Sequence, residues 1–137
     1  MIKQAVIILM GLPASGKTTW AQTNYPGYAR LDGDSLKTND KVCEALDIML
    51  AKGYNCIVDA TNGTLVRRHA LIQICRKHDV YIFGVQFTLP VNQCIARAKA
   101  RTDAGGPKVS RVAIYTVNKN FTAPSMLEGF HYLGLAV

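Results

Sequence analysis

Apolar and polar residues alternate along the chain in blocks that predict β-strands followed by α-helices. The continuous apolar run at 5–10 and the mainly apolar segments at 56–58 and 80–87 are typical of strands inside a sheet. Between these runs, apolar residues recur at helical spacing over 40–53 and 65–78. Repeated strand–helix units of this kind predict a parallel sheet with helices on both faces.

Proline and glycine mark the breaks between the remaining elements. Pro26-Gly27 follows one predicted helix, and Gly105-Gly106-Pro107 separates the last two. The elements delimited in this way are helices over 16–24, 91–102 and 109–121 and a short strand over 29–31. We expect Asp40 to cap the helix that ends at Gly53 and the helix over 65–78 to have a basic outer face. The chain is therefore predicted to be a single α/β domain over 1–137 with three layers and four or five parallel strands.

Composition excludes several classes of protein. Of the 137 residues, 49% are hydrophobic and 18% charged, a balance that excludes a disordered, collagen-like or coiled-coil chain. The apolar runs are far shorter than the roughly 20 residues that span a bilayer, so we expect no membrane partner.

The first residues lack the pattern of a secretion signal, which favours the cytoplasm. The four scattered cysteines favour buried thiols over a zinc site or disulfides: Cys43, Cys56, Cys75 and Cys94.

Positive charge is concentrated in one half of the chain. Residues 66–121 carry ten lysines and arginines against two acids, whereas the first 65 residues are neutral. A basic half of this kind predicts a polyanionic partner, meaning nucleotide phosphates, nucleic acid or both. A basic surface kept for solubility is the alternative.

The strongest chemical signal directly follows the first predicted strand. Residues 11–18, Gly-Leu-Pro-Ala-Ser-Gly-Lys-Thr, match GxxxxGK[ST] at every fixed position. In this phosphate-binding loop (P-loop), backbone N–H groups surround the phosphates, the lysine reaches the β and γ oxygens, and the hydroxyl contacts Mg²⁺. We therefore predict that the chain binds ATP and Mg²⁺. The residues expected to contact ATP in and just after the loop are Gly11, Pro13, Ala14, Ser15, Gly16, Lys17, Thr18 and Thr19.

Carboxylates follow two other predicted strands. Asp32 and Asp34 come after the second strand and Asp59 after the third, and the carboxyl ends of parallel strands meet at one edge of a sheet. A carboxylate at that edge can accept the proton of an attacking hydroxyl, and Asp59 can hold Mg²⁺ together with Thr18. For Asp32 and Asp34 the alternative is capping of a turn.

Further polar residues are candidates for holding an acceptor and closing the site. Lys37 can clamp an anionic group, and Thr61 and Asn62 can hydrogen-bond the acceptor or, alternatively, cap a helix. Arg97 and Arg101 share one helical face just before the Gly-Gly-Pro break. That face can close over the triphosphate as a lid, or it is only a solvated basic surface.

In order and spacing, these segments resemble the kinase domain of the phage 5′-polynucleotide kinases. The resemblance covers nearly the whole chain, including Arg67-Arg68 and Tyr132-Leu133-Gly134. It implies a P-loop kinase fold with a C-terminal helical lid and transfer of the ATP γ-phosphate to the 5′-hydroxyl of DNA or RNA. The family's phosphatase domain has no counterpart in this sequence, so no 3′-phosphatase activity is implied.

The resemblance also implies roles for individual residues. Lys17 and Thr18 bind ATP and metal, and Asp34 is the general base. The family has an arginine where this chain has Lys37, and a lysine cannot make the bidentate contact of an arginine with the acceptor's phosphate. Thr61 helps to contact the acceptor's phosphate, and the lid residues Arg97 and Arg101 engage the nucleotide. We class Arg101, like Lys17, as catalytic.

Two other classes of function are weighed against this one. The segment Leu31-Asp32-Gly33-Asp34 is also similar to adenylylsulfate kinase, and toxin and antibiotic phosphotransferases share the same core. A module that uses ATP only as a conformational switch needs no base near the γ-phosphate, so Asp34 counts against it. Neither the choice between DNA and RNA nor the oligomeric state follows from the sequence.

Overall fold

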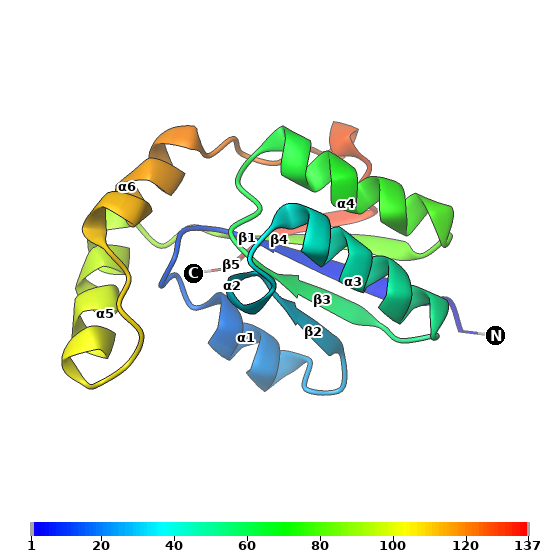
Figure 1. Cartoon of the computed structure of the whole chain (residues 1–137). Helices are drawn as coiled ribbons and strands as arrows, with labels where there is room; N and C mark the ends of the chain where they lie inside the picture. Colours follow the sequence, from blue (N-terminus) through cyan, green and yellow to red (C-terminus); the bar gives the residue numbers. More distant parts are fainter. Residues whose placement is uncertain (1, 137) are drawn as a thin grey trace.

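A five-stranded parallel sheet forms the middle layer of the computed structural model, which describes residues 2–136 (Figure 1). The strand order is β2-β3-β1-β4-β5, and each strand is parallel to its neighbours. The strands are β1 (Ala5–Met10), β2 (Ala29–Asp32), β3 (Cys56–Asp59), β4 (Tyr81–Phe87) and β5 (Tyr132–Ala136). The predicted α/β fold class is confirmed, with β5 as the edge strand that the apolar pattern did not delimit.

Strand β1 lies at the centre because all six of its residues are apolar and buried. Ile7 pairs with Ile57 of β3 on one side and with Phe83 of β4 on the other. From β1 the chain runs to β2 on one side, and from β3 it crosses to β4 on the other side of β1, so the connections reverse direction beside β1. Ligands of parallel sheets bind at the carboxyl ends of strands at such a switch point. The P-loop follows β1 at this point.

Helices cover both faces of the sheet. α1 (Lys17–Asn24) lies on one face, and α3 (Asn39–Ala51) and α4 (Leu65–Lys77) lie on the other (Figure 1). α3 and α4 bury their apolar stripes against β1 and β3 in the main hydrophobic core. Among residues 2–136, no helix combines the length and the apolar character needed to cross a membrane.

Two further helices, α5 (Val91–Asp103) and α6 (Arg111–Asn120), stand together beyond the carboxyl end of the sheet (Figure 1). They share a small apolar core with the P-loop, formed by Leu12, Cys94, Ala98 and Ile114. This contact fixes the predicted lid helices to the loop that they are expected to cover. A single 3₁₀ turn, η1 (Met126–Glu128), connects them to β5.

Two details of the predicted helices were wrong. Thr38, not Asp40, caps α3, because its hydroxyl accepts a hydrogen bond from the Lys41 N–H at 3.2 Å. Asp40 lies in the first turn, where its charge still interacts favourably with the helix dipole. Arg68 does not belong to a basic outer face of α4, since its side chain is fully buried.

The cysteines are free thiols, and three of the four are buried. Burial raises the pKa of Cys56 to about 11 and that of Cys75 to about 12. Both thiols therefore stay protonated at neutral pH, which makes them poor nucleophiles and metal ligands.

Candidate active site

A cavity of about 370 Å³ lies between the P-loop, the carboxyl ends of β2 and β3, and the connection from α5 to α6. Most of the residues singled out from the sequence line it. They are Pro13, Ala14, Ser15, Gly16, Lys17, Thr18 and Thr19 from the P-loop and α1, Asp32, Asp34, Asp59 and Thr61 from or just after the strand ends, and Arg101 from α5. The fold thus brings residues that are up to 88 positions apart in the chain to one cavity.

Two glycines shape the P-loop for different reasons. A Cβ atom on Gly11 would lie only 2.8 Å from the Cβ of Phe87, so a larger residue does not fit there. Gly16, which precedes α1, has φ +97°, a conformation that glycine adopts at little cost. The N–H of Gly11 donates to the Thr61 carbonyl at 3.0 Å, which positions the loop, and Gly11 is not among the residues that line the cavity; its contact with ATP stays a prediction.

Lys17 is folded back into the P-loop. Its Nζ donates to the carbonyl oxygens of Gly11 at 3.0 Å and Leu12 at 2.7 Å and to Ser15 Oγ at 3.3 Å. Burial lowers the pKa of Lys17 to about 8, although the negative charge of Asp59 partly opposes this shift. An anion stabilises a charged ammonium group better than neutral oxygens do. The position of Lys17 in the loop therefore suits the binding of a triphosphate.

The side chains of Thr18 and Asp59 contact each other next to Lys17. Thr18 Oγ1 donates to Asp59 Oδ2 at 2.6 Å, and Arg30 Nη1 donates to the same carboxylate oxygen at 2.8 Å. Hydroxyl and carboxylate oxygens are the ligands that Mg²⁺ prefers, so the pair fits this ion. Sequence reasoning missed Arg30, because only the pairing of β2 with β3 places its strand beside Asp59.

The two neighbouring carboxylates of the β2–α2 segment have different surroundings. Asp32 caps the short helix α2 (Gly33–Leu36): its Oδ1 accepts from Asp34 N at 3.1 Å and its Oδ2 from Ser35 Oγ at 2.9 Å. Both residues line the cavity, but the Asp34 carboxylate has no hydrogen-bond or ion-pair partner among residues 2–136. Capping therefore accounts for Asp32, and Asp34 remains the carboxylate free to accept a proton.

The lid arginines approach the P-loop from α5. Arg101 lines the cavity, and a methyl group built on Gly16 would lie 3.5 Å from Arg97 Nη1. Lys108, from the connection between α5 and α6, lines the same cavity and was not singled out from the sequence. Its position directly after the Gly105-Gly106-Pro107 break was the one signal that could have indicated it.

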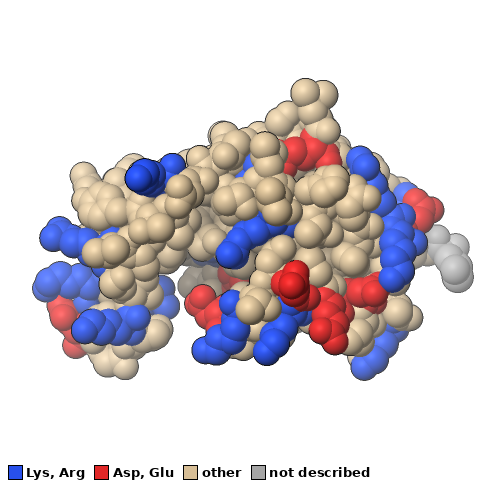
Figure 2. Space-filling model, turned by 45° about the horizontal axis from the view of Figure 1, so that its top comes forward, with Lys and Arg blue, Asp and Glu red and all other residues tan. Residues whose placement is uncertain are grey.

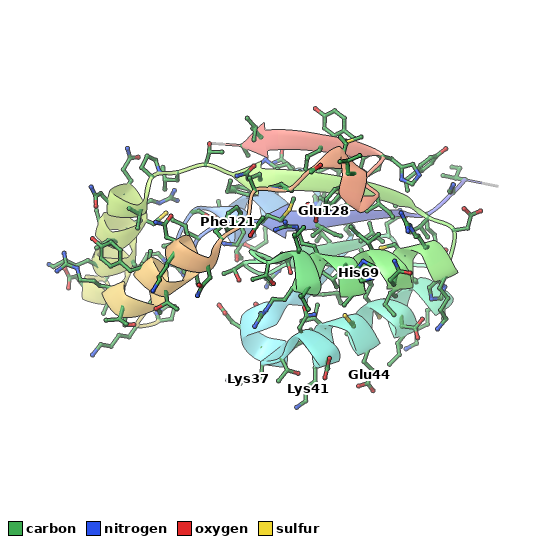
Figure 3. The ribbon with its side chains drawn as sticks, turned by 90° about the horizontal axis from the view of Figure 1, so that it is seen from above. Lys37, Lys41, Glu44, His69, Phe121 and Glu128 are labelled. Atoms are coloured by element: carbon green, nitrogen blue, oxygen red, sulfur yellow. The ribbon has the colours of Figure 1, made fainter. Side chains whose placement is uncertain are left out.

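Two candidates for acceptor binding do not line the cavity. Lys37 lies in the exposed turn between α2 and α3 (Figure 3), with φ +77°. Asn62 is buried, and its Nδ2 donates to the Leu9 carbonyl at 2.7 Å. Its amide thus fastens the β3–α4 connection to β1, and acceptor binding by Asn62 stays a prediction.

Comparison with sequence families gives a match over much of the chain. Residues 37–124 match a family described as "AAA domain". The P-loop at 11–18 lies outside the matched range, so the two observations are independent.

One curated relative is the bifunctional polynucleotide phosphatase/kinase of Schizosaccharomyces pombe. It is 28% identical over 132 residues, which cover 93% of this chain and 32% of the relative. The chain thus spans about a third of the length of that protein.

Solved structures with the same fold include three informative neighbours. A chain of the Pnkp1/Rnl/Hen1 RNA repair complex has a TM-score of 0.70 at 22% identity, covering 88% of this chain and 44% of that one. Kti12 of Chaetomium thermophilum in complex with ADP-AlF3 has a TM-score of 0.78 at 16% identity, and the match covers 96% of this chain and 88% of Kti12. The APS kinase CysC of Mycobacterium tuberculosis has a TM-score of 0.64 at 17% identity, and the match covers 98% of this chain and 90% of CysC.

Proposed function

Because the chain belongs to the AAA domain family and has the fold of the P-loop kinases, we propose that it transfers the γ-phosphate of ATP to the 5′-hydroxyl of a DNA or RNA strand. The observation that carries this proposal is the unpartnered carboxylate of Asp34 in the same cavity as Lys17. A protein that used ATP only as a conformational switch would need no such base.

The side chains of the cavity supply each part of a phosphoryl transfer. Asp34 accepts the proton of the 5′-hydroxyl. The hydroxyl oxygen forms a bond to the γ-phosphorus of ATP while the bond from that phosphorus to the leaving ADP breaks. Lys17 and Arg101 offset the negative charge that develops on the transferring group. Mg²⁺ held by Thr18 and Asp59 would neutralise charge on the β- and γ-phosphate oxygens.

A polynucleotide acceptor is supported by the relative's name and by the charge of this chain. The matched relative is named a polynucleotide phosphatase/kinase. On the face shown in Figure 2, several lysines and arginines lie over the α5–α6 end of the molecule, which adjoins the cavity, and others lie below the centre and at the opposite end. A basic surface beside the reacting atoms attracts the backbone of a nucleic-acid strand.

A small-molecule kinase is the second candidate. The structural likeness to APS kinase favours it, since that structure is a complex with AMPPNP and APS. Lys37, which is expected to contact the anionic group of either kind of acceptor, lies outside the cavity and does not distinguish the two candidates. The basic surface beside the cavity favours a strand, because several backbone phosphates can contact it.

A transfer assay with γ-labelled ATP distinguishes the two candidates. The acceptors, tested side by side, are 5′-hydroxyl oligonucleotides of DNA and RNA, a nucleoside 3′-phosphate and adenylylsulfate. We expect label on the oligonucleotides and none on a matched oligonucleotide that already carries a 5′-phosphate. Label on adenylylsulfate alone would overturn the proposal in favour of a small-molecule kinase.

A further inference from the structure

A second cavity, of about 300 Å³, adjoins the candidate active site. Thr61 lines both cavities, so the second begins where the first ends. One wall is the β3–α4 connection with the first turn of α4, and the other is the last part of α6. We call it the α4–α6 groove, and the polar residues and the glycine that line it are Thr61, Gly63, Thr64, Arg67, Thr116 and Asn120.

The two walls of the α4–α6 groove are fixed to each other at the end of α6. The N–H of Thr122 donates to the Gly63 carbonyl at 2.8 Å. The Phe121 ring packs on Gly63, where a Cβ atom would lie 3.0 Å from Phe121 Cδ2. Figure 3 shows Phe121 between α6 and α4. The groove is therefore a feature of the folded chain and does not depend on the tips of mobile side chains.

Arg67 gives the α4–α6 groove an uncompensated positive charge. Among residues 2–136 its guanidinium has no carboxylate within ion-pair distance, and the described residues that line the groove include no acid. The adjacent Arg68, by contrast, is paired with Glu128 at 2.7 Å. Arg67 also lies in the first turn of α4, where the helix dipole disfavours a cation. A bound anion would relieve this unfavourable interaction.

We propose that the α4–α6 groove binds a backbone phosphate of the acceptor strand, beyond the nucleotide whose 5′-hydroxyl is phosphorylated. This inference rests on the proposed function. A strand that ends at Asp34 reaches the groove by passing Thr61, which borders both cavities. The fork of the Arg67 guanidinium matches two oxygens of a phosphate, and the Thr64 hydroxyl and the Asn120 amide are neutral donors in the same groove.

Kinetics with acceptors that differ only in their number of phosphates test the proposal. The acceptors are a nucleoside 3′-phosphate, which carries one phosphate, and 5′-hydroxyl oligonucleotides, which carry several. In Arg67→Gln we expect the oligonucleotide KM to rise about tenfold, the loss typical of one charge-assisted contact. The KM for the nucleoside 3′-phosphate and the kcat for both acceptors should not change.

Two variants serve as controls for charge and for geometry. Lys52→Gln removes the same charge from the exposed end of α3 and should leave both KM values unchanged. Arg67→Lys keeps the charge but not the fork, so it should recover part of the oligonucleotide affinity. Arg67 is exposed, and all variants should melt at the temperature of the parent.

Binding measured without turnover separates this proposal from the proposed function. The probe is a fluorescent 5′-phosphorylated octanucleotide, followed by anisotropy across a salt series. Arg67→Gln should weaken binding about tenfold and reduce the slope of log Kd against log salt by about 0.7, the value for one phosphate of a single strand. Unchanged binding, or an equal rise in KM for the nucleoside 3′-phosphate, overturns the proposal. Failure of the parent to phosphorylate any oligonucleotide overturns the proposed function instead.

Discussion

Lys17 donates its hydrogen bonds to neutral oxygens of its own loop, and its pKa of about 8 is low enough to affect ligand binding. A triphosphate stabilises the charged ammonium form and therefore raises this pKa. Above about pH 8 the free protein has lost the proton that the complex retains, so ATP binding takes up a proton and weakens as the pH rises. Near pH 6.5 Lys17 is charged both in the free protein and in the ATP complex, so it takes up no proton when ATP binds.

Calorimetry of ATP binding measures this proton directly. At pH 9, in two buffers of different ionisation enthalpy, we expect uptake of about one proton per ATP bound. In Lys17→Met the uptake should disappear and ATP affinity should lose its dependence on pH in this range. Binding by the parent at pH 9 without proton uptake would show that Lys17 does not contact the phosphates.

At the scale of elements, α4 is held by a buried ion pair at its first turn. Arg68 Nε and Nη2 donate to the two carboxylate oxygens of Glu128, at 2.7 and 3.2 Å, and its Nη1 donates to the Asn62 carbonyl at 3.1 Å. The pair therefore links η1 to the connection that carries Thr61. Removing one partner leaves a buried charge without compensation, which is strongly destabilising.

Glu128→Gln should lower the free energy of unfolding by about 3 kcal/mol. Urea denaturation followed by circular dichroism measures this difference. The matched control is Glu44→Gln, because Glu44 is exposed on the surface of α3 (Figure 3) and should change stability by less than about 0.5 kcal/mol. Equal stabilities of the two variants would show that the pair does not support the fold.

The lid helix α5 makes a separate prediction. Arg101 lines the cavity, and an arginine over the transferring group acts mainly when charge moves onto that group. Arg101→Ala should lower kcat at least about 100-fold and change ATP affinity little, as measured by steady-state kinetics and equilibrium binding. Arg111→Ala, an exposed substitution at the start of α6, should be tolerated. Equal losses of kcat and ATP affinity in Arg101→Ala would instead make Arg101 a ground-state contact.

For the whole molecule, the uneven distribution of charge predicts a salt response. A strand that follows the basic α5–α6 end releases counterions when it binds, so the KM for a 5′-hydroxyl oligonucleotide should rise steeply with salt. The KM for a nucleoside 3′-phosphate should rise much less. Equal slopes for the two acceptors would mean that the basic surface does not take part in binding.

The elements and motifs that the sequence predicted are those that depend only on neighbouring residues in the chain. β1 is a continuous apolar run and the P-loop is a fixed motif, so both were assigned directly. β5 was not delimited, because Tyr132–Ala136 is only partly buried at the edge of the sheet and contains a glycine. Contacts between distant segments, such as Arg30 with Asp59 and Arg68 with Glu128, depend on strand order and on packing that no local pattern contains.

The choice between Asp32 and Asp34 shows what structure adds to the sequence. Both acids follow β2, and the spacing alone suits either as the base. The resemblance to the polynucleotide kinases implied Asp34, and the hydrogen bonds of Asp32 to Asp34 N and Ser35 Oγ add a physical reason, because they assign capping to the first acid and leave the second free.

The most direct measurement compares Asp34→Asn with Asp32→Asn in transfer of labelled phosphate from ATP to a 5′-hydroxyl oligonucleotide. Asparagine keeps the size and polarity of both acids and still caps a helix, but it cannot accept the proton of a hydroxyl. We predict that Asp34→Asn lowers transfer at least about 100-fold with ATP affinity retained, and that Asp32→Asn stays within about tenfold of the parent. Loss of transfer in Asp32→Asn with near-parental transfer in Asp34→Asn would contradict the assignment of Asp34 as the base.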